Sequence, residues 1–302
     1  MKAITSLDQM VQHLCDTGIQ KRIAVAVAED DNTLGALLEA HQRGFANPIL
    51  IGDKTRIESV LTEEKANPSD FQIIDIPDHQ KAVSEAVRMV RADEADVLMK
   101  GLIGTDKFLK AVLDKEKGLL PAGNVMSYVC AVELPKYHKL LFVSDTAVLP
   151  YPNLDQKVAM VKYTVEMTKR FGINDPKVAL IGASEKVNKA FPYSLDYQKI
   201  LEMDKVGQLP ACTIDGPLDV FLACDKESVK IKGIPTPVNG EADALIFPSL
   251  ESANSFYKGL MLFGGGELAG LIQGTIKPVV VMSRSESQKS KFYCVALSCL
   301  MA

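Results

Sequence analysis

The chain has 302 residues, of which 47% are hydrophobic and 24% charged, and its formal net charge is −4. This hydrophobic content is enough for a sizeable core and argues against an intrinsically disordered chain, and the lack of a long basic run argues against a broad nucleic-acid-binding surface. Because this length is near the upper limit for a single core, we expect two lobes with a cleft between them.

The elements that the sequence predicts alternate between short apolar runs and longer helical patterns. Strands are expected at residues 23–28, 48–51, 72–76, 97–99, 140–143, 178–181, 212–214, 244–247 and 279–282. Helices are expected at residues 33–43, 79–92, 105–115, 154–171, 252–263 and 288–300. Val- and Ile-rich runs of this kind are typical of buried parallel strands. The pattern therefore predicts an α/β fold with parallel sheets and crossover helices.

The composition changes at residues 118–124, which read Gly-Leu-Leu-Pro-Ala-Gly-Asn. This segment is where we expect the chain to cross between the lobes. The first α/β lobe is predicted to comprise residues 1–124 plus 284–302, because the last helix can return to it. The second α/β lobe is predicted to comprise residues 125–283.

The expected location of the protein is a reducing cytoplasm. Residues 1–20 lack the apolar core and cleavage site of a secretory signal, and no segment has about 20 consecutive apolar residues. The six cysteines form no CxxC pair and no metal-ligand pattern, so they are interpreted as small apolar residues.

Polar residues follow four of the expected strands, where ligands bind in open α/β sheets. They are Lys100-Gly101, Asp145 with Pro150, Asp215-Gly216-Pro217 and Ser283-Arg284. Each of these segments alone is weak evidence for a ligand site, because, for example, an Asp-Gly-Pro sequence is more often a turn than a site. Lys100 is open to two interpretations: a lysine that extends from the sheet toward solvent, or a phosphate contact.

Taken together, these segments resemble the phosphate acetyl and butyryl transferases over nearly the whole chain. The resemblance rests on ordered segments at residues 23–30, 47–53, 95–105, 140–145, 176–179, 215–218 and 254–258. It implies a two-lobed fold similar to isocitrate and isopropylmalate dehydrogenases, an active site in the interlobe cleft, and a homodimer or higher homo-oligomer. The implied reaction interconverts acyl-CoA plus phosphate with acyl phosphate plus CoA, without a metal or redox cofactor.

The resemblance also implies site residues. The family's catalytic Ser-Arg pair matches Ser283-Arg284, and its Asn-x-x-Tyr-Lys helix matches Asn254, Tyr257 and Lys258. A guanidinium suits phosphoryl oxygens, and a hydroxyl can hydrogen-bond a thiol or a developing oxyanion. The remaining expected substrate-binding residues are Lys100, Gly101, Thr105, Ser127, Asp145, Asp215, Gly216, Pro217 and Gly274.

The chain departs from the family where a general base is expected. An unperturbed thiol, with a pKa of about 8.5, is only a few per cent ionised at neutral pH, so CoA needs a proton acceptor. Related acetyltransferases carry an acidic residue within about two helical turns of the Ser-Arg pair, but Gln288, Lys289 and Ser290 stand there in this chain. Glu286 is either the substitute base or a carboxylate that favours a helix N-terminus.

Two other departures lie earlier in the chain. Family members usually carry an acidic residue near the position of Phe221, and this chain has Asp219 instead. The arginine of the acetyltransferases is replaced by an apolar residue around Leu262, which favours a longer acyl chain such as butyryl. The run Gly264-Gly265-Gly266 lacks GxGxxG spacing and is interpreted as a helix C-terminus.

Two alternatives to a phosphate acyltransferase acting by direct transfer stay open. A metal-dependent dehydrogenase would need clustered aspartates, and Asp215, Asp219 and Asp225 are spaced too loosely for that. A non-catalytic acyl-CoA binding protein would tolerate the missing acidic residues. The four histidines, His13, His41, His79 and His138, form no triad or ligand set.

Overall fold

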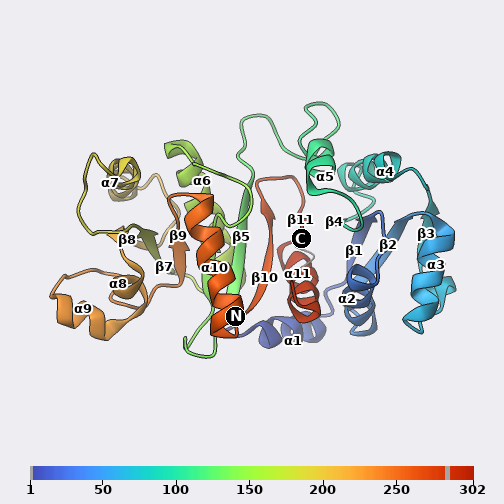
Figure 1. Ribbon diagram of the computed structural model, residues 1–302, viewed down its shortest axis with the longest axis horizontal. Helices are drawn as coiled ribbons and strands as arrows, with labels where there is room; N and C mark the ends of the chain where they lie inside the picture. The colour runs from blue at the N-terminus through green and yellow to red at the C-terminus, as the bar shows by residue number, and fades with distance from the viewer. Residues whose placement is uncertain (1–2, 283–285) are drawn as a thin grey trace. The chain divides into compact units, whose positions relative to one another are not determined.

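The structure is a computed structural model that describes residues 3–282 and 286–302. The chain divides into two compact units, each assembled from separate segments (Figure 1). We call them the Lys100 unit, Leu7–Met126 with Leu268–Ala302, and the Asp145 unit, Ser127–Glu267 with residues 3–6. None of the described helices is both long enough and apolar enough to cross a membrane.

The Lys100 unit contains a sheet with strand order β3-β2-β1-β4-β11-β10. The strands are β1 (Lys21–Ala26), β2 (Ala46–Gly52), β3 (Gln72–Asp75), β4 (Val97–Lys100), β10 (Glu267–Gln273) and β11 (Val279–Val280). The helices are α1 (Leu7–Thr17), α2 (Asp31–Gln42), α3 (Lys54–Glu63), the 3-10 turn η1 (Pro68–Asp70), α4 (His79–Arg91), α5 (Thr105–Val112) and α11 (Gln288–Met301). All neighbouring strands from β3 to β11 run parallel, and β10 is antiparallel to β11.

Side-chain caps fix where three of these helices begin. The carboxylates of Asp30, Asp53 and Asp78 accept hydrogen bonds from the backbone N–H groups of Thr33, Arg56 and Lys81. Each cap satisfies a backbone donor that the helix itself leaves without a partner. The helices therefore start directly after β1, β2 and β3, beside the carboxyl ends of the strands.

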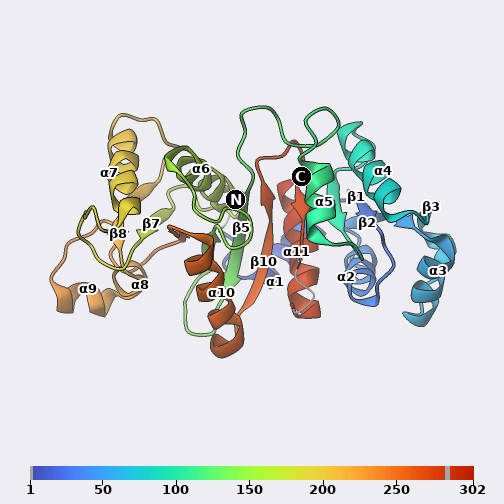
Figure 2. The ribbon, with the colours of Figure 1, turned by 45° about the horizontal axis from the view of Figure 1, so that its top comes forward.

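The helices of the Lys100 unit lie on both faces of its sheet. Helices α1, α2, α3 and α11 gather on one face, and α4 with α5 lies on the other (Figures 1 and 2). Every residue of α11 from Ser290 to Met301 is buried. Because α11 packs between α1 and α2, it forms the centre of its helical layer.

The Asp145 unit contains a sheet with strand order β5-β6-β9-β7-β8. Its strands are β5 (Ser127–Glu133), β6 (Leu141–Ser144), β7 (Lys177–Ile181), β8 (Thr213–Leu218) and β9 (Ala244–Ile246). Its helices are α6 (Leu154–Arg170), α7 (Pro192–Lys205), α8 (Val220–Cys224), α9 (Lys226–Lys232) and α10 (Leu250–Gly264). Strands β6, β9, β7 and β8 run parallel, and β5 is antiparallel to β6.

The α/β class is confirmed, and the sheets are mixed where purely parallel ones were expected. Strands β5 and β10, which the sequence patterns missed, supply an antiparallel strand in each unit. The two units are divided at other residues than the expected lobes, since Leu268–Ala302 groups entirely with Leu7–Met126. The physical reason is strand pairing, because β11 lies beside β4 with Val279 opposite Leu98.

Gly265 ends α10 in the left-handed conformation, at φ 64°. Glycine adopts this conformation without a Cβ penalty. The interpretation of Gly264-Gly265-Gly266 as a helix C-terminus is confirmed.

Candidate functional site

In the Lys100 unit, the carboxyl ends of β1 and β4 meet closely. Ala26 lies opposite Lys100, and the N–H groups of Gly101 and Leu102 donate to the carbonyl oxygens of Ala26 and Val27 at 2.9 and 2.7 Å. A Cβ at Gly101 would overlap the Val27 carbonyl. Glycine is therefore required at position 101 by backbone packing, whatever it also does for a substrate.

Lys100 ends β4 and is 9% exposed. Its ammonium donates to the carbonyl oxygens of Gly101 and Ile103 at 3.2 and 3.1 Å. These bonds hold the loop after β4 and place a positive charge at the strand end. Thr105, four residues after Gly101, is the exposed first residue of α5.

A pocket of about 240 Å³ opens at this edge. It is lined by the loop after β1, by Lys100 to Leu102, by Met282 after β11, and by Lys291 of α11. The start of α2 also lines it with Asp30 and Asp31, whose carboxylates accept from the N–H groups of Thr33 and Asn32, so two lysines and two acidic residues gather in one place. An anion that binds here would be attracted by the two lysines.

The predicted catalytic pair Ser283-Arg284 lies outside the described residues. Glu286 is half-buried and directly precedes Ser287, the N-cap of α11. Nearby, the buried hydroxyl of Ser290 accepts a hydrogen bond of 3.1 Å from the backbone N–H of Leu268. At position 290, where related acetyltransferases were expected to carry an acid, this chain uses a hydroxyl to hold α11 against β10.

Gly274 lies in the turn between β10 and β11, at φ 94°. Its carbonyl oxygen accepts a hydrogen bond of 2.9 Å from the side chain of Asn124. This hydrogen bond joins two segments of the Lys100 unit. Gly274 therefore has a structural role in this unit.

In the Asp145 unit, Asp145 follows β6 and is 1% exposed. Its Oδ2 accepts from the Ser127 hydroxyl at 2.9 Å and from the Tyr128 N–H at 3.0 Å. Its Oδ1 accepts from the N–H groups of Ala147 and Val148, both at 2.8 Å. Burial raises the pKa of Asp145, and these four donors oppose that rise.

The expected helix motif lies on α10, next to the loop after β6. Asn254 donates from Nδ2 to the carbonyl oxygen of Thr146 at 2.9 Å. Tyr257 and Lys258 follow three and four residues later, on the same helix face. Tyr257 is 9% exposed and Lys258 is exposed. The structure thus brings Ser127, Asp145 and the Asn254 face together at the carboxyl ends of β6 and β9.

Asp215, Gly216 and Pro217 lie inside β8, whereas the sequence pattern placed them after a strand. The N–H of Gly216 donates to Oδ1 of Asp215 at 2.8 Å, and a Cβ at Gly216 would come within 2.5 Å of the Leu180 Cβ. Strand β8 ends the strand order of its unit, and such edge strands tolerate proline. This segment is therefore used for packing against β7.

The other aspartates of that region are helix caps. Asp219 caps α8 and pairs with Lys232 at 2.5 Å, and Asp225 caps α9. Phe221 and Leu262, the positions of the other two departures, are 68% and 76% exposed.

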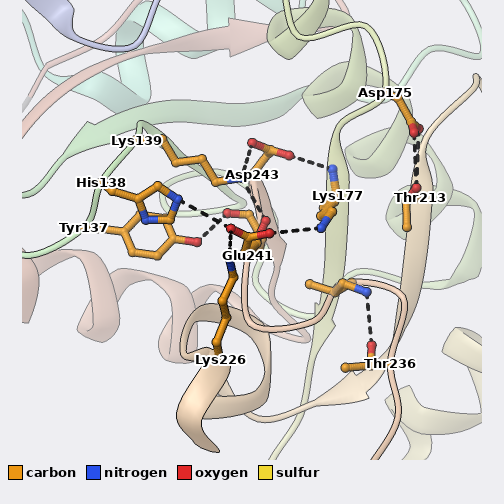
Figure 3. A network of polar contacts seen from close by, with 12 residues as sticks. Tyr137, His138, Lys139, Asp175, Lys177, Thr213, Lys226, Thr236, Glu241 and Asp243 are labelled. Atoms are coloured by element: carbon orange, nitrogen blue, oxygen red, sulfur yellow. Dashed lines mark hydrogen bonds and ion pairs between the residues drawn. The ribbon is translucent and has the colours of Figure 1, made fainter. Parts of the chain in front are cut away.

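A second polar network lies at the opposite edge of the same sheet (Figure 3). Asp243, just before β9, accepts from the Lys139 ammonium at 2.7 Å and from the Lys177 N–H at 2.8 Å. Glu241 pairs with Lys226 at 2.5 Å and with Lys177 at 3.4 Å. These contacts join the amino ends of β6, β7 and β9, so we assign the network to stability.

Lys291, which lines the pocket at 5% exposure, is a residue that the sequence pattern did not predict as part of a site. It stands in the polar run Ser-Glu-Ser-Gln-Lys-Ser-Lys, which looks like a solvated surface. The sequence did contain one signal for the burial of Lys291, which is that residue 291 directly precedes the apolar stretch of α11.

Comparison with known proteins gives consistent results. The sequence model of the family described as phosphate acetyl/butaryl transferase matches residues 7–84 and 79–299. The chain is 38% identical over 282 residues to a phosphate butyryltransferase of Clostridium acetobutylicum, covering 93% of each chain. It is 38% identical over 288 residues to a phosphate acetyltransferase of Thermotoga maritima, covering 94% of this chain and 96% of that one. Among solved structures, a branched-chain phosphotransacylase from Enterococcus faecalis V583 matches with a TM-score of 0.81 at 28% identity, over 93% of this chain and 99% of that one.

Proposed function

Because this chain belongs to the phosphate acetyl/butyryl transferase family, we propose that it interconverts butyryl-CoA or another short-chain acyl-CoA plus phosphate with acyl phosphate plus CoA. The observation that carries this proposal is the match over 93% of the chain to a phosphate butyryltransferase. The clustering of Asp145, Ser127 and the Asn254 face, and the lysine-lined pocket of the other unit, support it.

We propose direct transfer of the acyl group from one substrate to the other. A covalent acyl-enzyme would need an activated nucleophile, which for cysteine means a lowered pKa. Burial instead raises the pKa of Cys212 to about 11 and the pKa values of Cys224 and Cys299 to about 12. These thiols are protonated at neutral pH and are poor acyl acceptors.

In this mechanism Arg284 and Lys258 bind phosphoryl oxygens, and Ser283 orients the thiol or the oxyanion. Lys258 is suited to this role because it is exposed and shares a helix face with Asn254, next to the loop after β6. Glu286 remains a candidate base beside the start of α11. We propose no metal or redox cofactor, since Asp219 and Asp225 are committed to helix caps.

The test is phosphate-dependent CoA release from acetyl-, propionyl-, butyryl- and isobutyryl-CoA, with and without EDTA. We expect the largest kcat/KM with a four-carbon substrate. Arg284→Ala should lower kcat by roughly 100-fold or more, the size of effect seen when a group that stabilises a developing charge is removed. No turnover with any acyl-CoA would favour the non-catalytic binding protein, and a maximum with acetyl-CoA would favour an acetyltransferase.

Two variants assign the remaining roles. Lys258→Ala should raise the KM for phosphate about tenfold, equivalent to about 1.4 kcal/mol. The control Lys230→Ala, which removes an exposed lysine from α9, should leave this KM unchanged. If Glu286 is the base, Glu286→Gln should lower kcat roughly 100-fold and remove one limb of the pH profile. A carboxylate that only favours the helix N-terminus would leave the pH profile intact.

We also propose a cytoplasmic homo-oligomer. Leu262 and Phe263, at the end of α10, are 76% and 87% exposed, and such exposed apolar side chains support a contact between copies. Light scattering of the purified protein tests this, and a monomeric mass would contradict it.

A further inference from the structure

The pocket of the Lys100 unit is formed by three strand ends and two helix starts. The loops after β1, β4 and β11 supply Asp30, Lys100 and Met282, and helices α2 and α11 begin beside it. Its volume, about 240 Å³, is below the roughly 300–1,000 Å³ typical of drug-sized ligands. The space suits a small ligand or one end of a larger one.

Lys291 is the unusual member of this lining. It lies in the first turn of α11 and is 5% exposed. Within residues 3–282 and 286–302, no carboxylate lies within 4.0 Å of its ammonium, and the ammonium donates no hydrogen bond. The side chain of Lys291 is thus mostly buried, while its ammonium nitrogen is not among the fully buried side-chain atoms that lack a partner, so it keeps access to the solvent in the pocket.

The other buried lysines show how such a charge is normally accommodated. Lys157, at 3% exposure, pairs with Asp196 at 2.9 Å and also donates to a carbonyl oxygen. Lys100 donates to two carbonyl oxygens. Lys291 differs from both, although it shares its pocket with Lys100.

The carboxylates at the pocket are engaged elsewhere. Asp30 accepts from the Thr33 N–H at 2.8 Å, and Asp31 accepts from the Asn32 N–H at 2.8 Å. Neither carboxylate lies within 4.0 Å of the Lys291 ammonium, although both line the same pocket, so the ammonium forms no ion pair with the described residues of the lining.

We propose that this pocket binds a phosphate group and that the Lys291 ammonium is a cationic contact of that group, in addition to the phosphoryl contacts proposed above for Arg284 and Lys258. The ligand is inorganic phosphate, or a phosphate carried by a substrate such as the 3′-phosphate of CoA. The small volume favours inorganic phosphate. This inference rests on the proposed function for the identity of the ligand, and it assigns a binding residue outside the Ser283-Arg284 pair.

The arrangement explains why a lysine is retained at a buried position. We expect an apolar side chain to fill the same buried space without loss of stability, and binding residues commonly trade stability for function. A merely structural lysine would behave oppositely, because removing it would destabilise the fold.

The experiment uses the full chain in a phosphate-free buffer, with inorganic phosphate titrated by calorimetry and by thermal unfolding. The test variants are Lys291→Met and the more polar Lys291→Gln. The matched control is Lys289→Met, which removes an exposed lysine from the same helical turn. For the wild type and the control, we expect phosphate to raise Tm by the same amount.

Both Lys291 variants should bind phosphate at least tenfold more weakly, and Lys291→Met should unfold at the same or a higher temperature than the wild type without phosphate. A parallel titration with CoA and 3′-dephospho-CoA distinguishes the source. If the site takes the 3′-phosphate, Lys291→Gln weakens CoA binding tenfold and leaves dephospho-CoA unchanged. The inference is overturned if the variants bind both phosphate and CoA within twofold of the wild type.

These readouts do not depend on turnover. Loss of the proposed function would appear as a wild-type protein that binds phosphate but releases no CoA from any acyl-CoA. Failure of the present inference would appear as Lys291 variants with unchanged binding, whether or not the protein turns over.

Discussion

The hydroxyl of Ser127, at the start of β5, donates a 2.9 Å hydrogen bond to Oδ2 of Asp145, at the end of β6. Strands β5 and β6 are antiparallel neighbours, and Asp145, which directly follows β6, also accepts from three backbone N–H groups. This single carboxylate therefore holds the loop that follows β6, against which Asn254 of α10 is bonded.

Asp145→Asn should destabilise the protein by about 1–3 kcal/mol, because the amide nitrogen cannot accept from two of the four donors. Urea unfolding measures the loss. Asp155→Asn, which alters an exposed carboxylate in the first turn of α6, should cost about 0.3–1 kcal/mol. Equal losses for the two variants would show that the Asp145 bonds add nothing.

Gly216 and Gly259 form a second matched pair within the Asp145 unit. Gly216→Ala should destabilise by about 1–3 kcal/mol or more, because the new Cβ would come within 2.5 Å of the Leu180 side chain and 2.6 Å of its carbonyl oxygen. Gly259→Ala has open space on α10 and should stabilise by up to about 1 kcal/mol. Thermal and denaturant unfolding should move in opposite directions, and a shared direction would argue against the close approach of β8 to β7.

Asp243→Asn should lower stability by about 2 kcal/mol and leave kcat unchanged, because Asp243 is bonded to Lys139 and to the backbone of Lys177 away from the carboxyl-end loops. Glu227→Ala, which breaks an exposed pair with Lys230, should cost less than about 1 kcal/mol. A fall in kcat measured under conditions where all of the variant is folded would contradict the purely structural assignment of Asp243.

Thiol labelling tests the raised cysteine pKa values. Native protein treated with iodoacetamide at pH 8 should be modified rapidly only at Cys15, which is exposed, whereas the unfolded chain should take up six groups. Mass spectrometry reads both results, and Cys15→Ser should abolish the native reaction. Rapid native labelling of Cys224 would contradict its pKa of about 12.

The raised pKa values of Cys224 and Cys299 predict that the free energy of unfolding falls at alkaline pH. Cys224 and Cys299 have folded-state pKa values of about 12, above the ordinary value of 9.0, so the folded state holds these protons more tightly than the unfolded chain does. Their contribution to stability is complete below pH 9 and is lost as the pH rises through 12. Cys299→Ala should flatten the fall in unfolding free energy over this range, and an unchanged slope would contradict the prediction.

The sequence predicted those parts of the fold that have a strong local pattern. Val97–Lys100 is a short apolar run before a glycine, and it forms the buried strand β4 as expected. Strand β5 was missed because Ser127 and Tyr128 follow a Pro- and Gly-rich stretch that indicates a crossing. Strand β10 was missed because it follows three glycines and contains Gly270, and a sheet partner outweighs these local signals.

The candidate site was predictable only in part, for similar physical reasons. The resemblance identified Asn254, Asp145 and Lys100, and the structure shows their partners. It could not show that Asp215 and Gly216 lie inside a strand, since strand pairing decides that. The burial of Lys291 was hidden because its neighbours in sequence are polar, and its surroundings come from α2 and β4.

The division of the chain also determines the order in which the Lys100 unit can be completed during synthesis. Strands β1 to β4 leave the ribosome first, but β11, which pairs with β4, comes only after all of Ser127–Glu267 has been made. Until then β4 presents an open strand edge, and α2 lacks the buried helix α11 on its face. A nascent chain halted within Ser127–Glu267 therefore exposes apolar surface, so this protein should depend on chaperones most strongly just before its last 35 or so residues emerge.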